Sequence, residues 1–144
     1  MTEAYDDQNI FGKVLRGEIP GYTVYEDEHT QVIMDVFPQC EGHALVLPKE
    51  PCRNILDISA EAFAAVAETT RIVAKAAKSA FDAEGVTIQQ NSESAGGQAV
   101  FHMHMHVLPR KKGVALLPPA SEMASSDRLE RDAEKLRTAL EHQT

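Results

Sequence analysis

Three histidines alternate with apolar residues in the run His102-Met103-His104-Met105-His106-Val107-Leu108. Because successive side chains of a strand point to opposite faces, His102, His104 and His106 are expected to share one face. The apolar residues between them would then enter the core. A row of imidazoles on one face can supply a nucleophile, an acid or base, or metal ligands.

The segment that precedes this run, residues 91–101, contains the pair Gly96-Gly97. Glycines let backbone N–H groups approach a phosphate closely and form an anion-binding concavity without a lysine. A loop of this kind that leads directly into imidazoles places hydrogen-bond donors beside candidate nucleophiles. Phosphoryl chemistry requires that pairing, so we expect it here.

Two other interpretations of the histidine run stay open. The histidines could be ordinary structural polar residues, although strict alternation on an apolar strand makes this unusual. They could also bind a metal, because imidazole is a common zinc ligand and two histidines one strand step apart can chelate. No Asp, Glu or Cys flanks the run to complete a ligand set. We therefore expect no metal and no cofactor.

Hydrophobic periodicity predicts the strands and the first helix that position these residues. Apolar residues at positions 10, 11, 14 and 15 favour a short helix that Gly17 can stop. Strands are expected at residues 22–26, 31–36, 43–48, 86–90 and 101–108.

Two longer helices are also predicted. The first begins after Ser59 as its N-cap and is closed by Gly85. Its buried face is expected to consist of Phe63, Val66, Thr70, Val73, Ala77 and Ala80. The second begins at Asp127, with Asp127 and Glu130 as a capping box. Its apolar stripe comprises Leu129, Ala133, Leu136 and Leu140. The order of elements predicts an α+β domain, an antiparallel sheet with helices packed on one side.

Composition places this chain of 144 residues, 43% hydrophobic and 25% charged, among ordinary globular proteins. We expect residues 8–118 to form one domain and residues 119–144 a C-terminal helical extension of the same unit. The net charge of −8 argues against nucleic-acid binding, which relies on lysine and arginine. Without an apolar signal region or a membrane-length apolar run, we expect a cytoplasmic protein with reduced Cys40 and Cys52 and no membrane partner.

At this point the sequence closely resembles the histidine-triad (HIT) superfamily, whose signature the histidine run matches in full. The resemblance extends over residues 9–110. Residues 10–13, 16–20, 25–27 and 42–49 look like the Hint-type nucleotide-binding branch. The resemblance implies a five-stranded antiparallel sheet with a long central helix, a short N-terminal helix and a C-terminal helix. It also implies a homodimer, in which two sheets join across the long helix and a neighbouring strand.

The resemblance further implies hydrolysis or transfer at the α-phosphate of a purine nucleotide substrate, with phosphoramidates such as adenosine phosphoramidate as the leading class. His104 corresponds to the nucleophile, which forms a nucleotidyl-histidine that water then hydrolyses. His106 would contact the α-phosphate oxygens, His43 would support them by hydrogen bonding, and His102 completes the triad. The alternatives are a diadenosine-polyphosphate (Fhit-like) hydrolase and a nucleotide-binding interaction module with little turnover.

Binding positions follow from the same resemblance. The phosphate loop would contain Asn91, Gly97, Gln98 and Ala99. The ribose hydroxyls would bind Asp35. The base pocket would be apolar and contain Ile10, Phe11, Val14, Ile33, Val36 and Leu45. Each position also has an ordinary interpretation: His43 as a buried structural histidine, Asp35 as a turn residue, and the apolar set as core.

Two positions depart from the family pattern. Many members carry Cys-x-x-Cys near the start and bind a structural zinc, whereas Asn9 and Gly12 stand at those positions here. We therefore do not expect that zinc. At Ala99 the Hint-type pattern commonly has a hydroxyl residue that can donate to the phosphate or the leaving group. Ala99 offers only its backbone N–H there.

Overall fold

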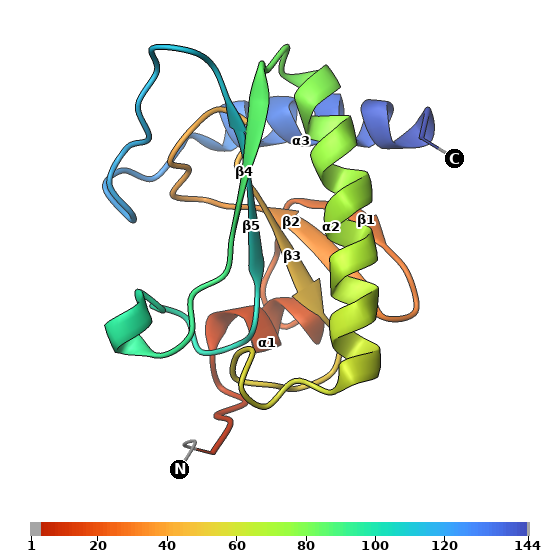
Figure 1. The fold of residues 1–144 in the computed structure, drawn as a ribbon, viewed down its shortest axis with the longest axis vertical. Helices are drawn as coiled ribbons and strands as arrows, with labels where there is room; N and C mark the ends of the chain where they lie inside the picture. Colours follow the sequence, from red (N-terminus) through yellow and green to blue (C-terminus); the bar gives the residue numbers. More distant parts are fainter. Residues whose placement is uncertain (1–3, 144) are drawn as a thin grey trace.

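The computed structural model describes residues 4–143, and its centre is a five-stranded antiparallel sheet (Figure 1). The strands lie in the order β1-β2-β3-β5-β4. Their bounds are β1 (Thr23–Glu26), β2 (Thr30–Met34), β3 (Ala44–Pro48), β4 (Gly85–Gln89) and β5 (Met105–Arg110). The predicted α+β class and the five-stranded antiparallel sheet are confirmed.

Three helices accompany the sheet: α1 (Ile10–Leu15), α2 (Ala60–Ala80) and α3 (Ser126–Glu141). Ser59 caps α2 as predicted, since its side chain accepts a hydrogen bond from the backbone N–H of Ala62. Asn9 caps α1 in the same way. A short 3₁₀ turn, η1 (Ser94–Gly96), lies in the loop between β4 and β5.

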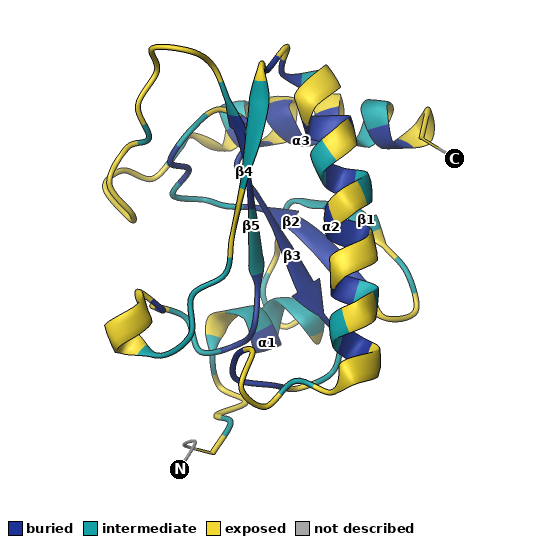
Figure 2. Ribbon diagram, viewed as in Figure 1, coloured by how far each residue is buried: buried dark blue, intermediate teal, exposed yellow. Residues whose placement is uncertain are grey.

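The two central strands, β2 and β3, are buried along their whole length (Figure 2). One face of the sheet packs against α2 and α3 through a core that includes Val32, Met34, Ala44 and Val46. The other face packs against α1 through Ile33, Leu45 and Leu47. The expectation that the helices lie on one side is therefore wrong. Because β2 and β3 carry apolar side chains on both faces, helices must pack on both faces to shield these side chains from water.

Two predicted boundaries are also wrong. Strand β5 begins at Met105 and not at Phe101. Its ladder with β3 starts at the Met105–Val46 pair, and in the segment before it the N–H of Met103 donates to the Cys52 carbonyl instead. Helix α2 ends at Ala80, and the left-handed turn belongs to Asp82, which has a φ of 50°. Gly85, predicted to close the helix, is the first residue of β4.

Helix α3 begins one residue before the predicted start. Its N-cap is Ser125, whose side chain accepts from the backbone N–H of Arg128, so Asp127 lies in the first turn. An acidic side chain is favourable there because unpaired N–H groups point toward it. The predicted stripe is buried in the same core as α2 and consists of Leu129, Ala133, Leu136 and Leu140. Among the described residues, no helix is long and apolar enough to cross a bilayer.

Candidate active site

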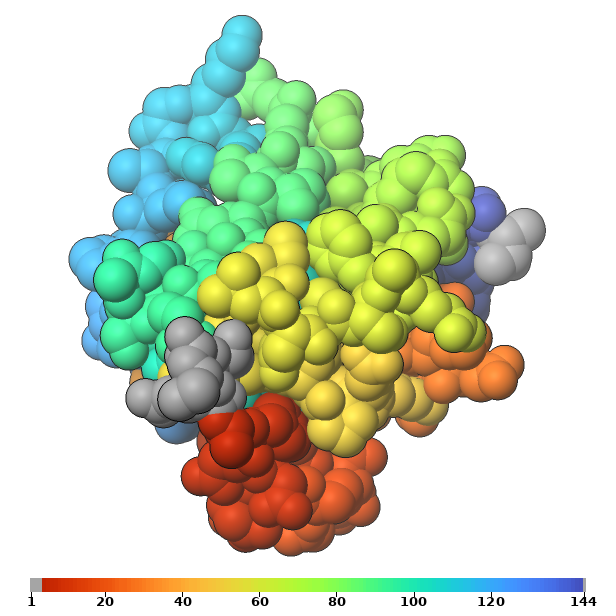
Figure 3. All heavy atoms as spheres, turned by 60° about the horizontal axis from the view of Figure 1, so that its bottom comes forward, coloured from red at the N-terminus to blue at the C-terminus, as the bar shows by residue number. Residues whose placement is uncertain are grey.

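A pocket of about 290 Å³ lies between α1, the loop after β2 and the loop before β5. Figure 3 shows the N-terminal segment (red) beside the loop that follows β3 (yellow). The pocket has an apolar part and a polar part. The apolar part contains all six predicted base-pocket residues: Ile10, Phe11, Val14, Ile33, Val36 and Leu45. The polar part includes Asp35, Asn91, His104 and His106, beside Gly97 and Ala99.

His104 is held by a single backbone contact that decides which of its nitrogens can react. Its Nδ1 lies 2.7 Å from the carbonyl oxygen of His102. A carbonyl oxygen only accepts hydrogen bonds, so Nδ1 carries the proton and Nε2 keeps its lone pair. Burial lowers the pKa of His104, which keeps the ring neutral at pH 7. The arrangement leaves an unprotonated Nε2 as a nucleophile.

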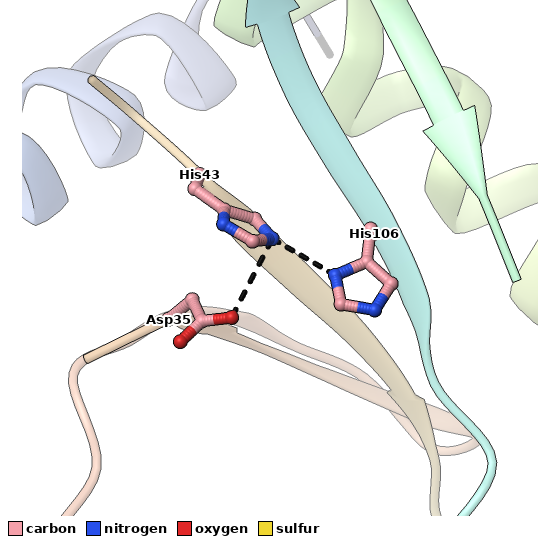
Figure 4. A group of neighbouring side chains, drawn as sticks. All are labelled: Asp35, His43 and His106. Atoms are coloured by element: carbon pink, nitrogen blue, oxygen red, sulfur yellow. Dashed lines mark hydrogen bonds and ion pairs between the residues drawn. The ribbon is translucent and has the colours of Figure 1, made fainter. Parts of the chain in front are cut away.

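His43 and His106 form a second set of directed contacts (Figure 4). The backbone N–H of Gln39 donates to His43 Nδ1 at 3.1 Å, so in neutral His43 the proton lies on Nε2. That Nε2 lies 2.9 Å from His106 Nδ1 and donates to it. His106 must then carry its own proton on Nε2. Its ring packs against the His104 ring, with 4.9 Å between their centroids.

The proton order along these rings requires that they stay neutral. Burial lowers the pKa of His43 to about 3 and that of His106 to about 4, with smaller contributions from neighbouring histidines. At pH 7 His106 therefore presents an N–H donor beside the lone pair of His104. A donor next to a nucleophile is what an attack on a phosphate ester or amide needs, because negative charge grows on the phosphate oxygens.

Asp35 follows the end of β2 and lines the pocket. One carboxylate oxygen accepts the backbone N–H of Phe37 at 2.8 Å, and the other lies 3.5 Å from His43 Nε2. Burial raises the pKa of Asp35 to about 6, and the Phe37 bond opposes that shift. At pH 7 the group is mostly an anion at the wall of the pocket, able to accept hydrogen bonds from two hydroxyl groups.

Asp35, His43 and His106 also form a group that could hold a cation, since their ligand atoms lie within 4.8 Å of one another. The sequence argument against a metal considered only the flanks of the histidine run, and Asp35 reaches it through the fold. However, the Gln39 N–H occupies His43 Nδ1, so metal binding at Nε2 would require that proton to leave or the Gln39 bond to break. The hydrogen-bond directions favour a proton relay over a set of metal ligands.

His102 lies outside the pocket lining. It is buried, its Nε2–H donates to the carbonyl oxygen of Pro48 at 2.9 Å, and its Nδ1 accepts from the Tyr5 hydroxyl at 2.6 Å. The Tyr5 oxygen in turn accepts from the Asn9 side-chain amide at 2.9 Å. Of the expected row of three imidazoles, only those of His104 and His106 line the pocket, because the contacts with Pro48 and Tyr5 hold the His102 ring elsewhere. Tyr5 was missed, and nothing in the sequence pattern marked it.

Of the four residues predicted for the phosphate loop, Asn91, Gly97 and Ala99 line the pocket and Gln98 does not. Gly97 lines the pocket with a φ of 94°, a conformation that favours glycine. The N–H of Ala99 donates to no residue that the structure describes. Gln98, in contrast, is buried outside the pocket lining. All four contacts of its side chain are internal: from Glu93 N–H and the Asn54 amide, and to the carbonyls of Arg53 and Val100.

The C-terminal segment reaches the pocket too, which the sequence did not predict. Pro119 and Ala120 form part of its wall. The backbone N–H of Leu117 donates to Gln39, and that of Ala124 donates to Val36. These two contacts fix the segment against the loop after β2. No sequence periodicity indicates such an approach, because it depends on the path of an irregular segment.

Comparisons with known proteins show the family and support the fold. The family model for the HIT domain matches residues 16–113. A crystal structure of a Hit-like protein involved in cell-cycle regulation from Bartonella henselae, with an unknown ligand, has a TM-score of 0.89 and 43% identity, covering 94% of this chain and 99% of that chain. A zinc-bound histidine triad family protein from Mycobacterium smegmatis has a TM-score of 0.82 and 34% identity, covering 94% of each chain. Adenylylsulfatase HINT3 of Arabidopsis thaliana is 30% identical over 127 residues, which are 88% of this chain and 64% of that protein.

Proposed function

This chain belongs to the HIT family of nucleotide hydrolases and transferases, and from that premise we propose that it cleaves purine nucleotides at the α-phosphate through a nucleotidyl-histidine on His104. The observation that carries the proposal is the 2.7 Å contact between His104 Nδ1 and the His102 carbonyl. This contact leaves Nε2 unprotonated at the pocket.

The reaction has two displacements. The lone pair of His104 Nε2 attacks the α-phosphorus, and the bond from phosphorus to the leaving group breaks. That bond's electron pair goes to the leaving group, and an amine leaving group also takes up a proton from solvent. Water then attacks the same phosphorus and gives up a proton to solvent, the electron pair of the bond to Nε2 returns to that nitrogen, and the nucleoside monophosphate is released. His106 Nε2–H and the Ala99 N–H donate to phosphate oxygens in both steps, where the charge is greatest.

The nucleoside binds across the two parts of the pocket. The purine packs in the apolar part, and the two ribose hydroxyls donate to Asp35. This orientation is supported by Asp35, which lines the same pocket as the apolar residues and whose carboxylate lies within 4.8 Å of a ring nitrogen of His106. The carboxylate is needed as an anion, so ribose binding weakens below pH 6, where Asp35 takes up a proton.

Two leaving groups have support. An amine, as in adenosine phosphoramidate, follows from the Hint-type motifs at residues 10–13, 16–20 and 42–49. Sulfate, as in adenosine 5′-phosphosulfate, is favoured by the similarity to the adenylylsulfatase of Arabidopsis thaliana. In both cases the same nucleotidyl-histidine forms, and only the group that departs differs.

The deciding experiment combines turnover with trapping of the intermediate. The protein is incubated with adenosine phosphoramidate, adenosine 5′-phosphosulfate and diadenosine polyphosphates, quenched rapidly, and digested for mass spectrometry. We expect an adenylyl group on the peptide containing His104 and turnover of at least one of the first two substrates. Nucleotide binding without any adduct or turnover would favour the interaction module. Faster turnover of the diadenosine polyphosphates would favour the Fhit-like alternative, and stoichiometric zinc in purified protein would favour the metal site.

We further propose that the protein is a homodimer, joined across α2 and β4. Strand β4 lies at one end of the strand order, so one of its edges has no strand partner among the described residues. Its residue Ile88 is 44% exposed, which is unusual for a large apolar side chain on a strand. A second copy that pairs there would bury both features.

A further inference from the structure

Glu93 holds a backbone conformation that side-chain-bearing residues rarely adopt. Its φ of 65° and ψ of 161° fall in a region occupied almost only by glycine. Such a conformation is unfavourable by itself and persists only where the surrounding contacts fix it. Strained residues of this kind gather at functional sites. Glu93 lies directly before η1, in the loop whose Gly97 and Ala99 line the pocket.

The contacts that fix Glu93 come from the segment after β3. Its carboxylate accepts two hydrogen bonds from Arg53, at 2.8 Å from Nε and 3.0 Å from Nη2, and a third from the Asn54 amide. The Arg53 side chain is only 9% exposed, and its guanidinium lies 4.2 Å from the centroid of the Phe101 ring. A two-pronged arginine–carboxylate pair fixes both position and direction.

The backbone of Glu93 joins the two ends of the loop. Its N–H donates to the Gln98 side chain at 2.8 Å. Its carbonyl oxygen accepts from Gly96 N–H at 2.9 Å and from Gln98 N–H at 3.0 Å. With these contacts made, the next backbone N–H along the chain, that of Ala99, is left at the pocket wall.

We propose that Arg53 and Glu93 are positioning residues, which hold the loop so that its backbone N–H groups meet the α-phosphate. The inference rests on the proposed function for the identity of the ligand. Neither residue lines the pocket, and the charge of Arg53 faces Glu93, so neither binds the phosphate itself. A glycine at position 93 would relieve the strain but would remove the side chain that ties the loop to Arg53 and Asn54.

The test compares affinity for AMP with affinity for adenosine, which lacks the phosphate. Glu93→Gln keeps the shape of the side chain and removes its charge. We expect AMP binding to weaken about tenfold, in line with the loss of charge-assisted hydrogen bonds, while adenosine binding changes less than twofold. A general loss of folding would reduce both affinities together.

A matched control lies on α2, where Glu68 accepts two hydrogen bonds from Arg71 in an exposed pair. Glu68→Gln should leave both affinities unchanged, because exposed pairs contribute little. The double variant Arg53→Met with Glu93→Gln should lose no more AMP affinity than the worse single variant, since the two residues act as a unit. Additive losses, or an unchanged ratio of AMP to adenosine affinity in Glu93→Gln, would overturn the proposal.

A ligand-free measurement separates this proposal from the proposed function. Amide hydrogen exchange at Gly96, Gly97 and Gln98 should become about tenfold faster in Glu93→Gln and stay unchanged in Glu68→Gln. This result is expected even if no substrate in the panel is turned over. Unchanged exchange in Glu93→Gln would show that the Arg53–Glu93 pair does not hold the loop, whatever the reaction.

Discussion

At the scale of single residues, the backbone rather than other side chains assigns the protons of the candidate site. The carbonyl of His102 fixes the proton of His104 on Nδ1, and the N–H of Gln39 fixes that of His43 on Nε2. The proton of His106 is then fixed on Nε2, because its Nδ1 accepts the hydrogen bond from His43 Nε2. Because main-chain groups cannot exchange donor for acceptor, the order of protons is built into the fold.

We expect His104→Ala to abolish turnover while the fold and nucleotide affinity remain. Loss of a covalent nucleophile should lower kcat by several orders of magnitude. The measurement is steady-state kinetics on the substrate that the panel identifies, with thermal unfolding as a check on the fold. His29→Ala, which changes an exposed histidine outside the pocket, serves as control. Retention of more than about a tenth of the wild-type kcat would contradict the role of His104.

The Asp35→Asn substitution tests the ribose contact. A carboxylate that accepts two hydroxyls forms charge-assisted hydrogen bonds, each worth on the order of 1.5–3 kcal/mol. Calorimetry should show a much greater loss for ribonucleoside monophosphates than for their 2′-deoxy counterparts. The pKa of about 6 adds a second signature, because the wild-type preference for ribonucleotides should decline as pH falls below 6. Equal losses for both ligands would exclude a ribose contact.

At the scale of elements, the contacts of the segment before β5 decide which histidines reach the pocket. His102 and His104 precede the strand, in a segment held by the Pro48 carbonyl and by a hydrogen bond from Met103 N–H to Cys52. In this segment His102 accepts a hydrogen bond from the Tyr5 hydroxyl, whose oxygen accepts one from the Asn9 side-chain amide. The loop before β5 is fixed in turn by Gln98 and Glu93.

Ala99→Ser should raise kcat for phosphoramidates. Ala99 is exposed at the pocket wall, so a hydroxyl can be added without a steric clash in the loop. A hydrogen bond formed mainly in the transition state would be worth about 1 kcal/mol, or roughly fivefold in rate. Affinity for the product monophosphate should change less than kcat does.

The measurement for Ala99→Ser uses two substrates, one with an amine and one with a phosphate leaving group. A gain limited to the amine would indicate that the hydroxyl acts on the leaving group. If neither rate rises, then the backbone N–H and the histidines already suffice, and the departure from the family pattern at this position has no catalytic meaning.

At the scale of the whole molecule, one face of the sheet forms the main core and the other forms the candidate site. The face under α2 and α3 holds the main core, and the face under α1 holds the pocket and its buried histidines. Burying titratable side chains beside a pocket affects stability as well as chemistry, because a group whose pKa differs between the folded and unfolded states makes folding pH-dependent.

We expect the free energy of unfolding to fall as pH decreases from 7 to 4. His43, His102 and His106 have folded-state pKa values of about 3 to 4, below the unfolded value of 6.5, so the unfolded state takes up protons first. Each such histidine lowers the free energy of unfolding by roughly 1.4 kcal/mol per pH unit between these limits. Asp35, whose pKa is raised to about 6, raises the free energy of unfolding as pH falls below 6, but the effect of this single group is smaller than that of the three histidines together.

Urea unfolding at several pH values measures this slope, and His29→Gln, at an exposed position, should leave it unchanged. A free energy of unfolding that is flat or that rises between pH 7 and 5 would contradict the neutral state of the buried histidines. That result would also remove the proton order on which the role of His106 depends.

The homodimer is tested by Ile88→Glu. A charge at this exposed position of β4 should be expelled from an apolar interface and convert the protein to a monomer. Light scattering after size exclusion measures the mass directly. Met123→Glu, at a side chain that is 63% exposed and lies outside the sheet, is the control and should remain dimeric. A wild-type monomer would contradict the proposal outright.

The sequence by itself determined the elements and the chemical character of the site. Local periodicity predicted the helices and five strands. The buried apolar face of an element shows in the spacing of its residues, as with Val66, Val73 and Ala77 of α2. The alternating histidines and the Gly96-Gly97 loop indicated phosphoryl chemistry, which stays a prediction. The resemblance of the histidine run and of the segments at residues 10–13, 16–20, 25–27 and 42–49 to the HIT family predicted membership of that family, which is confirmed.

Only the tertiary structure decided which predicted residues meet and in which protonation state. Asp35 reaches His43 and His106, Tyr5 reaches His102, and Gln98 turns away from the pocket into the loop. These are contacts between segments distant in sequence, and periodicity carries no information about them. The proton on each imidazole depends on the same contacts, because a backbone carbonyl or N–H at hydrogen-bond distance decides which nitrogen keeps its lone pair.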